Sequence, residues 1–403
     1  MKTQPLVIAL GGMIAMAAAM GIGRFVYTPI LPFMADALAL TKGQSGLIAA
    51  ANFFGYFVGS LIGATGFLRG DPRTWALGGL AASGLTTGAM ALTTSIPAFL
   101  VLRFIGGGAS ALVMVFASAI VFDRLAAAGR STLSHLHFSG VGLGMSVSAV
   151  LVSGLAAGHI GWAGLWVATG TVTLAAFAAV AFMFPRGVGN RGGDVGHDDG
   201  GTPPGTAAEK SFDRRIIPLV LSYGLFGFGY VVTATFISVM VRQTPSIAPI
   251  EPVVWLVVGL AAVPSVAFWA WIGRRLGNPA SIALACLVEA AGVAATVSFD
   301  SAAAVLIGAA LLGGTFMGIT AVGMMTAREM SLGDPRRMLA MIVCAFGTGQ
   351  MIGPAFAGYV AEITGDFTAP SLIASGALIV SAGLAMTLTA RPPGKITRIK
   401  LPG

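Results

Sequence analysis

Twelve long apolar segments, separated by charged or Pro/Gly-rich breaks, limit what this chain can fold into. A helix needs about 20 apolar residues to cross a bilayer, where only helices and closed barrels satisfy their own backbone polar groups. Charged residues make up 9% of the chain, against about 25% in soluble domains. The sequence therefore predicts an all-α membrane protein with twelve transmembrane helices. The expected spans are residues 6–33, 45–68, 74–94, 97–122, 132–157, 162–184, 216–241, 253–273, 279–299, 302–327, 337–362 and 369–390.

Lysine and arginine are sorted by membrane side. If the N-terminus is cytoplasmic, 19 of the 23 basic residues fall in inner segments, while the outer loops hold only Lys42 and Arg242. Cytoplasmic loops of membrane proteins carry an excess of Lys and Arg, so we expect both termini in the cytoplasm. The net charge of +8 then reflects topology, and no nucleic-acid partner is expected.

The two halves of the chain resemble each other. A shift of about 206 residues superimposes glycines of the first span on those of the seventh, and a similar shift relates spans five and eleven. A parallel repeat of this kind places a substrate site between the halves, near the middle of the membrane. We expect an N-terminal six-helix half at 1–184, a cytoplasmic linker at 185–215 and a C-terminal six-helix half at 216–403. The matching pairs are Gly21 with Gly227, Gly23 with Gly229, Gly140 with Gly349, and Gly144 with Gly353.

This arrangement resembles the major facilitator superfamily, and local motifs strengthen the resemblance. Arg103-Phe-Ile-Gly-Gly107 is similar to the family's buried-arginine motif of the fourth span, and the stretch from Phe346 to Gly358 is similar to its Gly/Pro-rich eleventh span. The Gly-Arg24-Phe-x-Tyr-Thr-Pro sequence of the first span resembles a poorly characterised bacterial branch. The resemblance implies two pseudo-symmetric six-helix bundles, alternating access and a bacterial inner membrane. We also expect a monomer.

Arg24 places a charge inside the first apolar segment, where a guanidinium costs roughly 2.5–3.5 kcal/mol at the helix centre. Helical spacing puts Tyr27 on the same face, and Pro29 and Pro32 are expected to bend the outer end of the helix. The functional interpretation is that Arg24 and Tyr27 contact a polar or anionic substrate in a central cavity. The alternative is a hinge in which backbone carbonyls or a carboxylate hold Arg24.

Five further residues are candidates for substrate binding. The repeat places Tyr230 opposite Arg24, with Tyr223 on the same face, and two rings facing an arginine suit a planar or carboxylated solute. Ordinary packing of these rings is the alternative. Asn52 and Tyr56 lie one turn apart in the second span, where interhelical hydrogen bonding is the alternative. Gln350 lies among small residues, which leave it room to line the cavity.

Glu289 is the one carboxylate well inside a predicted span. Apolar surroundings disfavour its charged form, so it could carry a proton between states that differ in access to water. The family's ninth span is usually peripheral, which speaks against this role. Arg103 resembles the buried arginine that the family associates with proton coupling. Because Arg103 lies near the outer end of its span, a snorkelling or locking role is the alternative.

These features predict a secondary active transporter that moves a small organic solute, anionic or carboxylated, by alternating access with proton coupling, as a symporter or an antiporter. A proton-driven exporter of drugs or metabolites is the alternative within this class, although Met145 stands where the antiporter pattern carries a proline. A polytopic membrane enzyme or a sensor is the alternative from other classes. The sequence contains no nucleotide-binding loop, catalytic triad or zinc motif, so we expect no catalytic residues, no cofactor and no metal.

Overall fold

The computed structural model describes residues 4–65, 68–186, 216–331 and 335–388, and nearly all of them are helical. Most of the predicted linker at 185–215 lies outside the described residues. The helices are α1 (Pro5–Met16), η1 (Ala17–Ile22), α2 (Tyr27–Leu38), α3 (Lys42–Ala64), α4 (Pro72–Ala89), α5 (Ile96–Ala127), α6 (Ser134–Ala157), α7 (Trp162–Met183), α8 (Ile217–Gln243), α9 (Glu251–Leu276), α10 (Asn278–Ser298), α11 (Ala302–Glu329), α12 (Pro335–Thr364) and α13 (Thr368–Met386), with single 3₁₀ turns between some of them.

Eleven helical segments of the described chain are long and apolar enough to cross a membrane, with Pro5–Leu38 counted as one. They confirm an all-helical membrane architecture and agree with eleven of the twelve predicted spans. The remaining segment is α4, which has 18 residues and carries Ser83, Thr86 and Thr87. At 1.5 Å per residue it rises about 27 Å, close to the ~30 Å of a bilayer core. The length of α4 is therefore compatible with a twelfth span.

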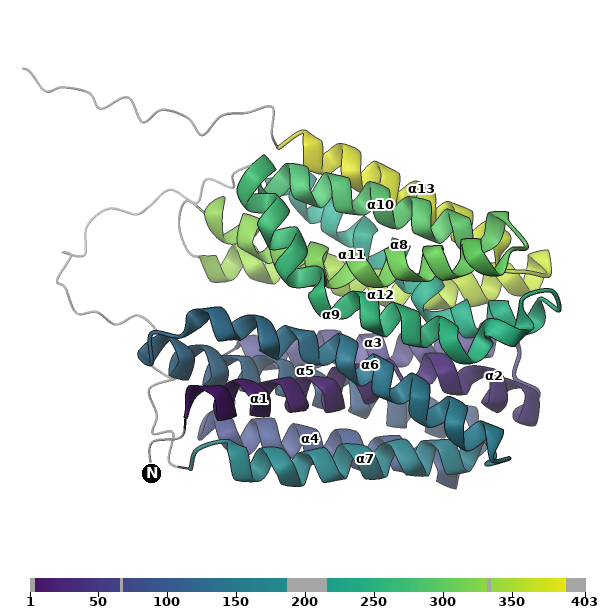
Figure 1. The fold of residues 1–403 in the computed structure, drawn as a ribbon, viewed down its shortest axis with the longest axis horizontal. Helices are drawn as coiled ribbons and strands as arrows, with labels where there is room; N and C mark the ends of the chain where they lie inside the picture. Colours follow the sequence, from purple (N-terminus) through teal and green to yellow (C-terminus); the bar gives the residue numbers. More distant parts are fainter. Residues whose placement is uncertain (1–3, 66–67, 187–215, 332–334, 389–403) are drawn as a thin grey trace, which may run out of the picture.

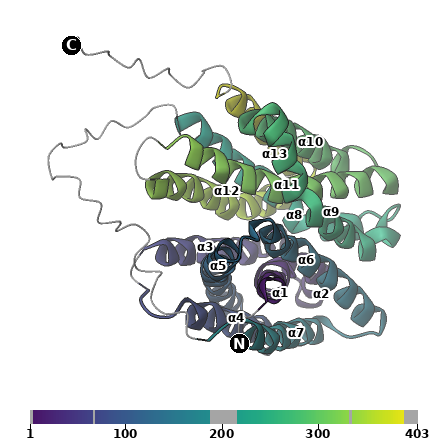
Figure 2. The same ribbon diagram turned by 60° about the vertical axis from the view of Figure 1, so that its left-hand side comes forward.

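The helices form two groups in space, and each group consists of helices that follow one another in the sequence. Figure 1 shows α1–α7 on one side and α8–α13 on the other, and Figure 2 shows the same division from a second direction. The groups meet mainly where α3 packs on α12 and α6 packs on α9. Glycines allow these backbones to approach closely. A Cβ atom at Gly142 of α6 would lie 2.6 Å from the Gly259 carbonyl oxygen of α9.

The same helix packing occurs in both groups. In α6, a Cβ atom at Gly144 would lie 2.1 Å from the Ala17 carbonyl oxygen of the first span. In α12, a Cβ atom at Gly349 would lie 2.1 Å from the Gly224 carbonyl oxygen of α8. Each Gly-x-x-x-Gly pair thus seats its helix on the first helix of its own group. The repeated sequence pattern therefore corresponds to repeated packing.

The first span is broken between α1 and α2. The π-helical segment η1 is followed by turns at residues 23–26, and α2 begins at Tyr27. The sequence predicted a bend at Pro29 and Pro32, but both residues lie within α2. Pro29 falls in the first turn of α2, where a missing N–H removes no helical hydrogen bond. The break at residues 23–26 therefore lies before both prolines, apart from the bend that was predicted there.

Candidate functional site between the two helix groups

Arg103 and Asn52 hold the broken segment of the first span. Arg103 of α5 donates from Nη1 to the Gly23 carbonyl at 3.2 Å and from Nη2 to the Arg24 carbonyl at 2.9 Å. Asn52 of α3 donates from Nδ2 to the carbonyl of Arg103 at 2.9 Å. Carbonyls left without helical partners by the break thus obtain charged donors. Arg103 therefore positions the backbone on which Arg24 lies.

The Arg24 side chain crosses from the first helix group to the second. Its guanidinium donates from Nη2 to Oε1 of Gln350 on α12 at 2.8 Å. It also lies over the rings of Tyr56 and Phe53 on α3, with distances from Cζ to the ring centroids of 3.9 and 4.7 Å. Arg24 is only 3% exposed. This charged side chain is therefore enclosed by aromatic rings and a single amide.

Gln350 extends the contact into an aromatic cluster of the second group. Its Nε2 donates to the hydroxyl of Tyr230 on α8. The Tyr230 ring stacks on Phe316 of α11 at 5.5 Å and 10°, and on Phe346 of α12 at 6.0 Å and 8°. These stacked rings form one apolar cluster, which we call the aromatic wall. The structure thus joins Arg24, Gln350 and Tyr230 in one chain of hydrogen bonds beside that wall.

Two predicted binding residues point to backbone carbonyls instead. Tyr27 donates its hydroxyl to the Ser45 carbonyl of α3 at 2.9 Å, and Tyr223 donates to the Thr320 carbonyl of α11 at 2.5 Å. Tyr27 lies on the Arg103 side, with the Arg103 guanidinium 5.1 Å from its ring centroid. Arg24 and Tyr27 both line a small cavity that Arg103 also borders.

The site carries positive charge without a matching carboxylate. Arg24 and Arg103 are both buried, and Asp36–Arg242 is the ion pair formed among the described residues. The Nε atoms of both buried arginines also lack a hydrogen-bond partner. A cavity of about 10 Å³ lies between Arg24, Arg103 and Thr28, which is room for about one water molecule. The site is therefore closed around two uncompensated guanidinium groups.

Contacts between the groups close the end of the protein where α2 ends and α3 begins, which we call the distal end. Lys42 donates to the carbonyls of Ala361, at 3.4 Å, and of Gly365. The backbone N–H of Gly43 donates to a carboxylate oxygen of Glu362 at 2.8 Å. Deeper in, Thr28 donates to the Ala234 carbonyl at 2.8 Å. These contacts separate the Arg24 site from solvent at the distal end.

Glu289 lies in α10, on the side of the second group away from α1–α7 (Figure 1). It is fully buried, and neither carboxyl oxygen has a hydrogen-bond partner. Thr315 of α11 lies beside it, but the Thr315 hydroxyl donates to the Leu311 carbonyl at 2.7 Å. Tyr230 is within electrostatic reach of Glu289. The carboxyl is therefore secluded behind the aromatic wall and does not contact Arg24.

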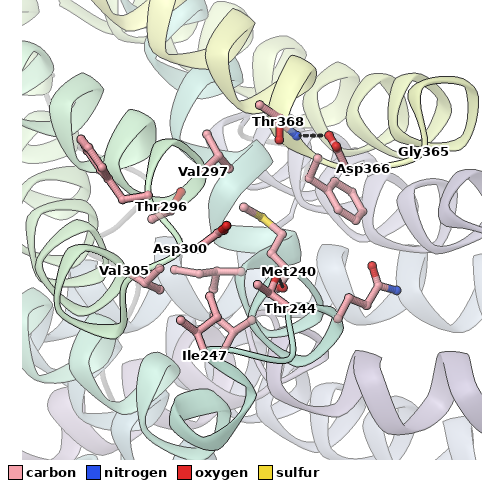
Figure 3. Close-up of a pocket in the computed structure, with 15 residues that line it drawn as sticks. Met240, Thr244, Ile247, Thr296, Val297, Asp300, Val305, Gly365, Asp366 and Thr368 are labelled. Atoms are coloured by element: carbon pink, nitrogen blue, oxygen red, sulfur yellow. Dashed lines mark hydrogen bonds between the residues drawn. The ribbon is translucent and has the colours of Figure 1, made fainter.

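A separate hollow of about 330 Å³ opens within the second group at the distal end (Figure 3). Its charged walls are Asp300 and Asp366, and Asp366 accepts a hydrogen bond from the backbone N–H of Thr368 at 2.8 Å. Gly365 and Phe367, next to the contact made by Lys42, also line it. This hollow has the opposite charge to the Arg24 site and does not lie between the groups.

The phenylalanines of the aromatic wall were not predicted from the sequence as part of the site. Phe316 and Phe346 come from spans ten and eleven, so only the fold brings them to Tyr230. Phe226 stacks on Tyr230 at 5.3 Å and 26°, and its spacing of four residues was the available signal. Among the described residues, no group of three metal-ligating side chains comes together.

Comparisons with known proteins agree with this architecture. A family model described as "Uncharacterised MFS-type transporter YbfB" matches residues 16–386. The crystal structure of the nucleoside transporter NupG is similar, with a TM-score of 0.71 and 14% identity, over 96% of this chain and 99% of that chain. A point mutant of NupG gives a TM-score of 0.70 and 13% identity, over 95% and 99%. No curated protein sequence matches the chain.

Proposed function

Because the chain belongs to the family of YbfB-like MFS-type transporters, we propose that it moves a small organic anion across the membrane by alternating access. The family and the structural neighbours are transporters, which agrees with a transport function rather than an enzymatic one. The substrate binds between the helix groups. Arg24 and Tyr56 contact it directly and Gln350 lies next to it. Tyr230 belongs to the aromatic wall beside it, Tyr223 packs on Phe346 of that wall, and Asn52 and Tyr27 support the broken helix.

The observation that carries the anion proposal is the unpaired charge of Arg24 and Arg103. Buried charges in proteins are normally paired, since removal from water costs several kcal/mol per ion. Here the guanidinium of Arg24 meets only an amide and aromatic faces. A carboxylate on the substrate supplies the missing charge and accepts two N–H donors from the planar fork. The site is therefore complementary to a carboxylated ligand.

The aromatic wall favours a planar substrate. The near-parallel rings of Tyr230, Phe316 and Phe346 stack on one another beside Arg24, and a planar aromatic substrate can extend this stack after the groups separate. This wall also supports a second candidate, a neutral nucleoside, since NupG is described as a nucleoside transporter. The unpaired Arg24 favours the anion over that candidate, because a neutral ring leaves the guanidinium uncompensated.

Proton coupling is assigned to Glu289, with Arg103 as a positioning residue. A buried carboxyl without hydrogen-bond partners is neutral while dry and ionises when water reaches it. Arg103 acts on the carbonyls of Gly23 and Arg24, so it moves with the broken helix. An exporter that uses the same groups in the opposite direction is the alternative.

Alternating access requires two bodies that rock about the site. We assign these bodies to residues 1–184 and 216–403, joined by a cytoplasmic linker at 185–215, with α4 as the twelfth span. The distribution of Lys and Arg supports cytoplasmic termini, and we assign the protein to a bacterial inner membrane. The closed distal end then faces outward. In this conformation the transporter is closed to the outside. We also assign it as a monomer.

Counterflow in proteoliposomes tests the proposed function. We would load vesicles with unlabelled benzoate, nicotinate or uridine and follow entry of the same labelled compound. The anion proposal expects transient accumulation of a labelled carboxylate and none of uridine. Accumulation of uridine alone would replace the anion by the nucleoside, and no counterflow of any member of a wider panel of acids would contradict the proposal.

A further inference from the structure

We propose that Gln350 is a neutral stand-in for the substrate's anionic group, and that it allows the empty transporter to close and return. This inference rests on the proposed function, because it assigns the substrate carboxylate to Arg24. It goes further, because it predicts that the protein can carry out net transport of its substrate and is not restricted to exchanging one substrate molecule for another. The residue concerned is the one side chain of the second helix group that accepts a hydrogen bond from Arg24 in the described structure.

The position of the amide supports this role. Gln350 is 1% exposed, and its Oε1 lies 2.8 Å from Nη2 of Arg24. Its Nε2 is engaged with the Tyr230 hydroxyl, which fixes the carbonyl oxygen toward the guanidinium. An amide carbonyl and one carboxylate oxygen have similar shape and accept the same donor. Gln350 thus occupies the place that a bound carboxylate needs.

The energetics of closing explain why a stand-in is useful. Closing the groups around Arg24 without any acceptor would bury an unsatisfied charged donor, which is strongly unfavourable. The amide removes part of that penalty, so the empty site can close. A carboxylate adds Coulomb attraction to the guanidinium and can accept two of its N–H donors, whereas the amide oxygen accepts one here, so a carboxylate displaces the amide. The carrier can therefore change conformation both loaded and empty.

A ligand-free thermal stability cycle tests the contact itself. We would measure melting temperatures of the wild type, Gln350→Glu and Gln350→Ala, each with Arg24 intact and with Arg24→Ala. Glutamate should raise the melting temperature when Arg24 is present and lose this increase when Arg24 is absent. Equal shifts in the two backgrounds would overturn the stand-in role. Because no substrate is needed, this result is independent of the proposed function.

A transport measurement tests the consequence. In proteoliposomes that contain labelled benzoate, Gln350→Ala should lower the ratio of net efflux to exchange against external benzoate about tenfold or more, because only net efflux requires an empty return. The control is Thr348→Ala, an exposed position on α12 whose hydroxyl bonds within its own helix. Equal slowing of both fluxes would overturn the inference. Failure of the wild type to transport benzoate would instead count against the proposed substrate class.

Discussion

Substituting Gly46 with alanine should force the two helix groups apart at the distal end. A Cβ atom at Gly46 of α3 would lie 2.2 Å from the Pro354 carbonyl oxygen and 3.3 Å from Cα of Gly358, both in α12. Carbon–oxygen contacts between helices normally lie at about 3.3–3.6 Å. The two backbones must therefore separate by about 1 Å to accept the methyl group.

The strain from this methyl group exists only while the distal end is closed. Overpacking in a well-packed contact costs about 1–3 kcal/mol. Because the strain disappears when the groups part, the equilibrium should shift toward the conformation open at the distal end by about 5- to 150-fold. The shift requires no change in the substrate site itself.

Cysteine labelling measures this shift. Ala49 lies beside Arg24 and is 1% exposed, so Ala49→Cys reports access from the distal end once Cys286 and Cys344 are replaced by serine. A membrane-impermeant maleimide should label it faster when Gly46→Ala is added. The control is Gly154→Ala, where a Cβ atom meets nothing within 4 Å. Equal labelling rates in both variants would refute the view that α3 and α12 hold the distal end closed.

Three further predictions follow from the same arrangement. Glu289→Gln should abolish accumulation driven by a pH gradient and spare counterflow; accumulation that persists would exclude Glu289 as the proton carrier. Thr94→Cys should react with impermeant maleimide in intact cells and Ala128→Cys only after the membrane is breached, and the reverse pattern would invert the topology. Asp36→Asn removes an ion pair with Arg242 whose side chains are 68% and 34% exposed. Its melting temperature should therefore change little, because such pairs contribute about 1 kcal/mol or less, and a large loss would show that this pair holds the distal end.

The sequence could predict the architecture because lipid simplifies the problem. Apolar length and the distribution of Lys and Arg depend on local sequence, so the spans were readable. α4 is the one predicted span whose helix is not among the eleven, because its 18 residues include Pro72 and Arg73 as well as Ser and Thr residues, which lower its hydropathy. The regular spacing of a helix did not predict the break in the first span, because η1 and the turns at residues 23–26 depart from α-helical geometry. The π-helical turn packs closely against Gly144. This packing depends on the folded structure, so the turn could not be predicted from the sequence.

The candidate site was likewise predicted only in part from the sequence. Scarcity of charge in apolar segments identified Arg24, Arg103 and Glu289. The partner of Arg24 could not be predicted, because Gln350 is 326 residues away and meets it only when the two groups pack together. The aromatic wall was missed for the same reason, since Phe residues are common in membrane helices and only their stacking on one another distinguishes these.

Binding of a carboxylate at Arg24 is the central claim, and a thermal-shift titration tests it most directly. We would titrate benzoate and its neutral isostere benzamide into the purified wild type and into Arg24→Ala. Any ligand that binds only the folded state raises the melting temperature. The account predicts a shift with benzoate, none with benzamide, and a loss of benzoate affinity of about thirty-fold or more in Arg24→Ala, since removing one partner of a buried charge pair costs about 2–5 kcal/mol. A benzoate shift that survives in Arg24→Ala, or an equal shift with benzamide, would contradict it.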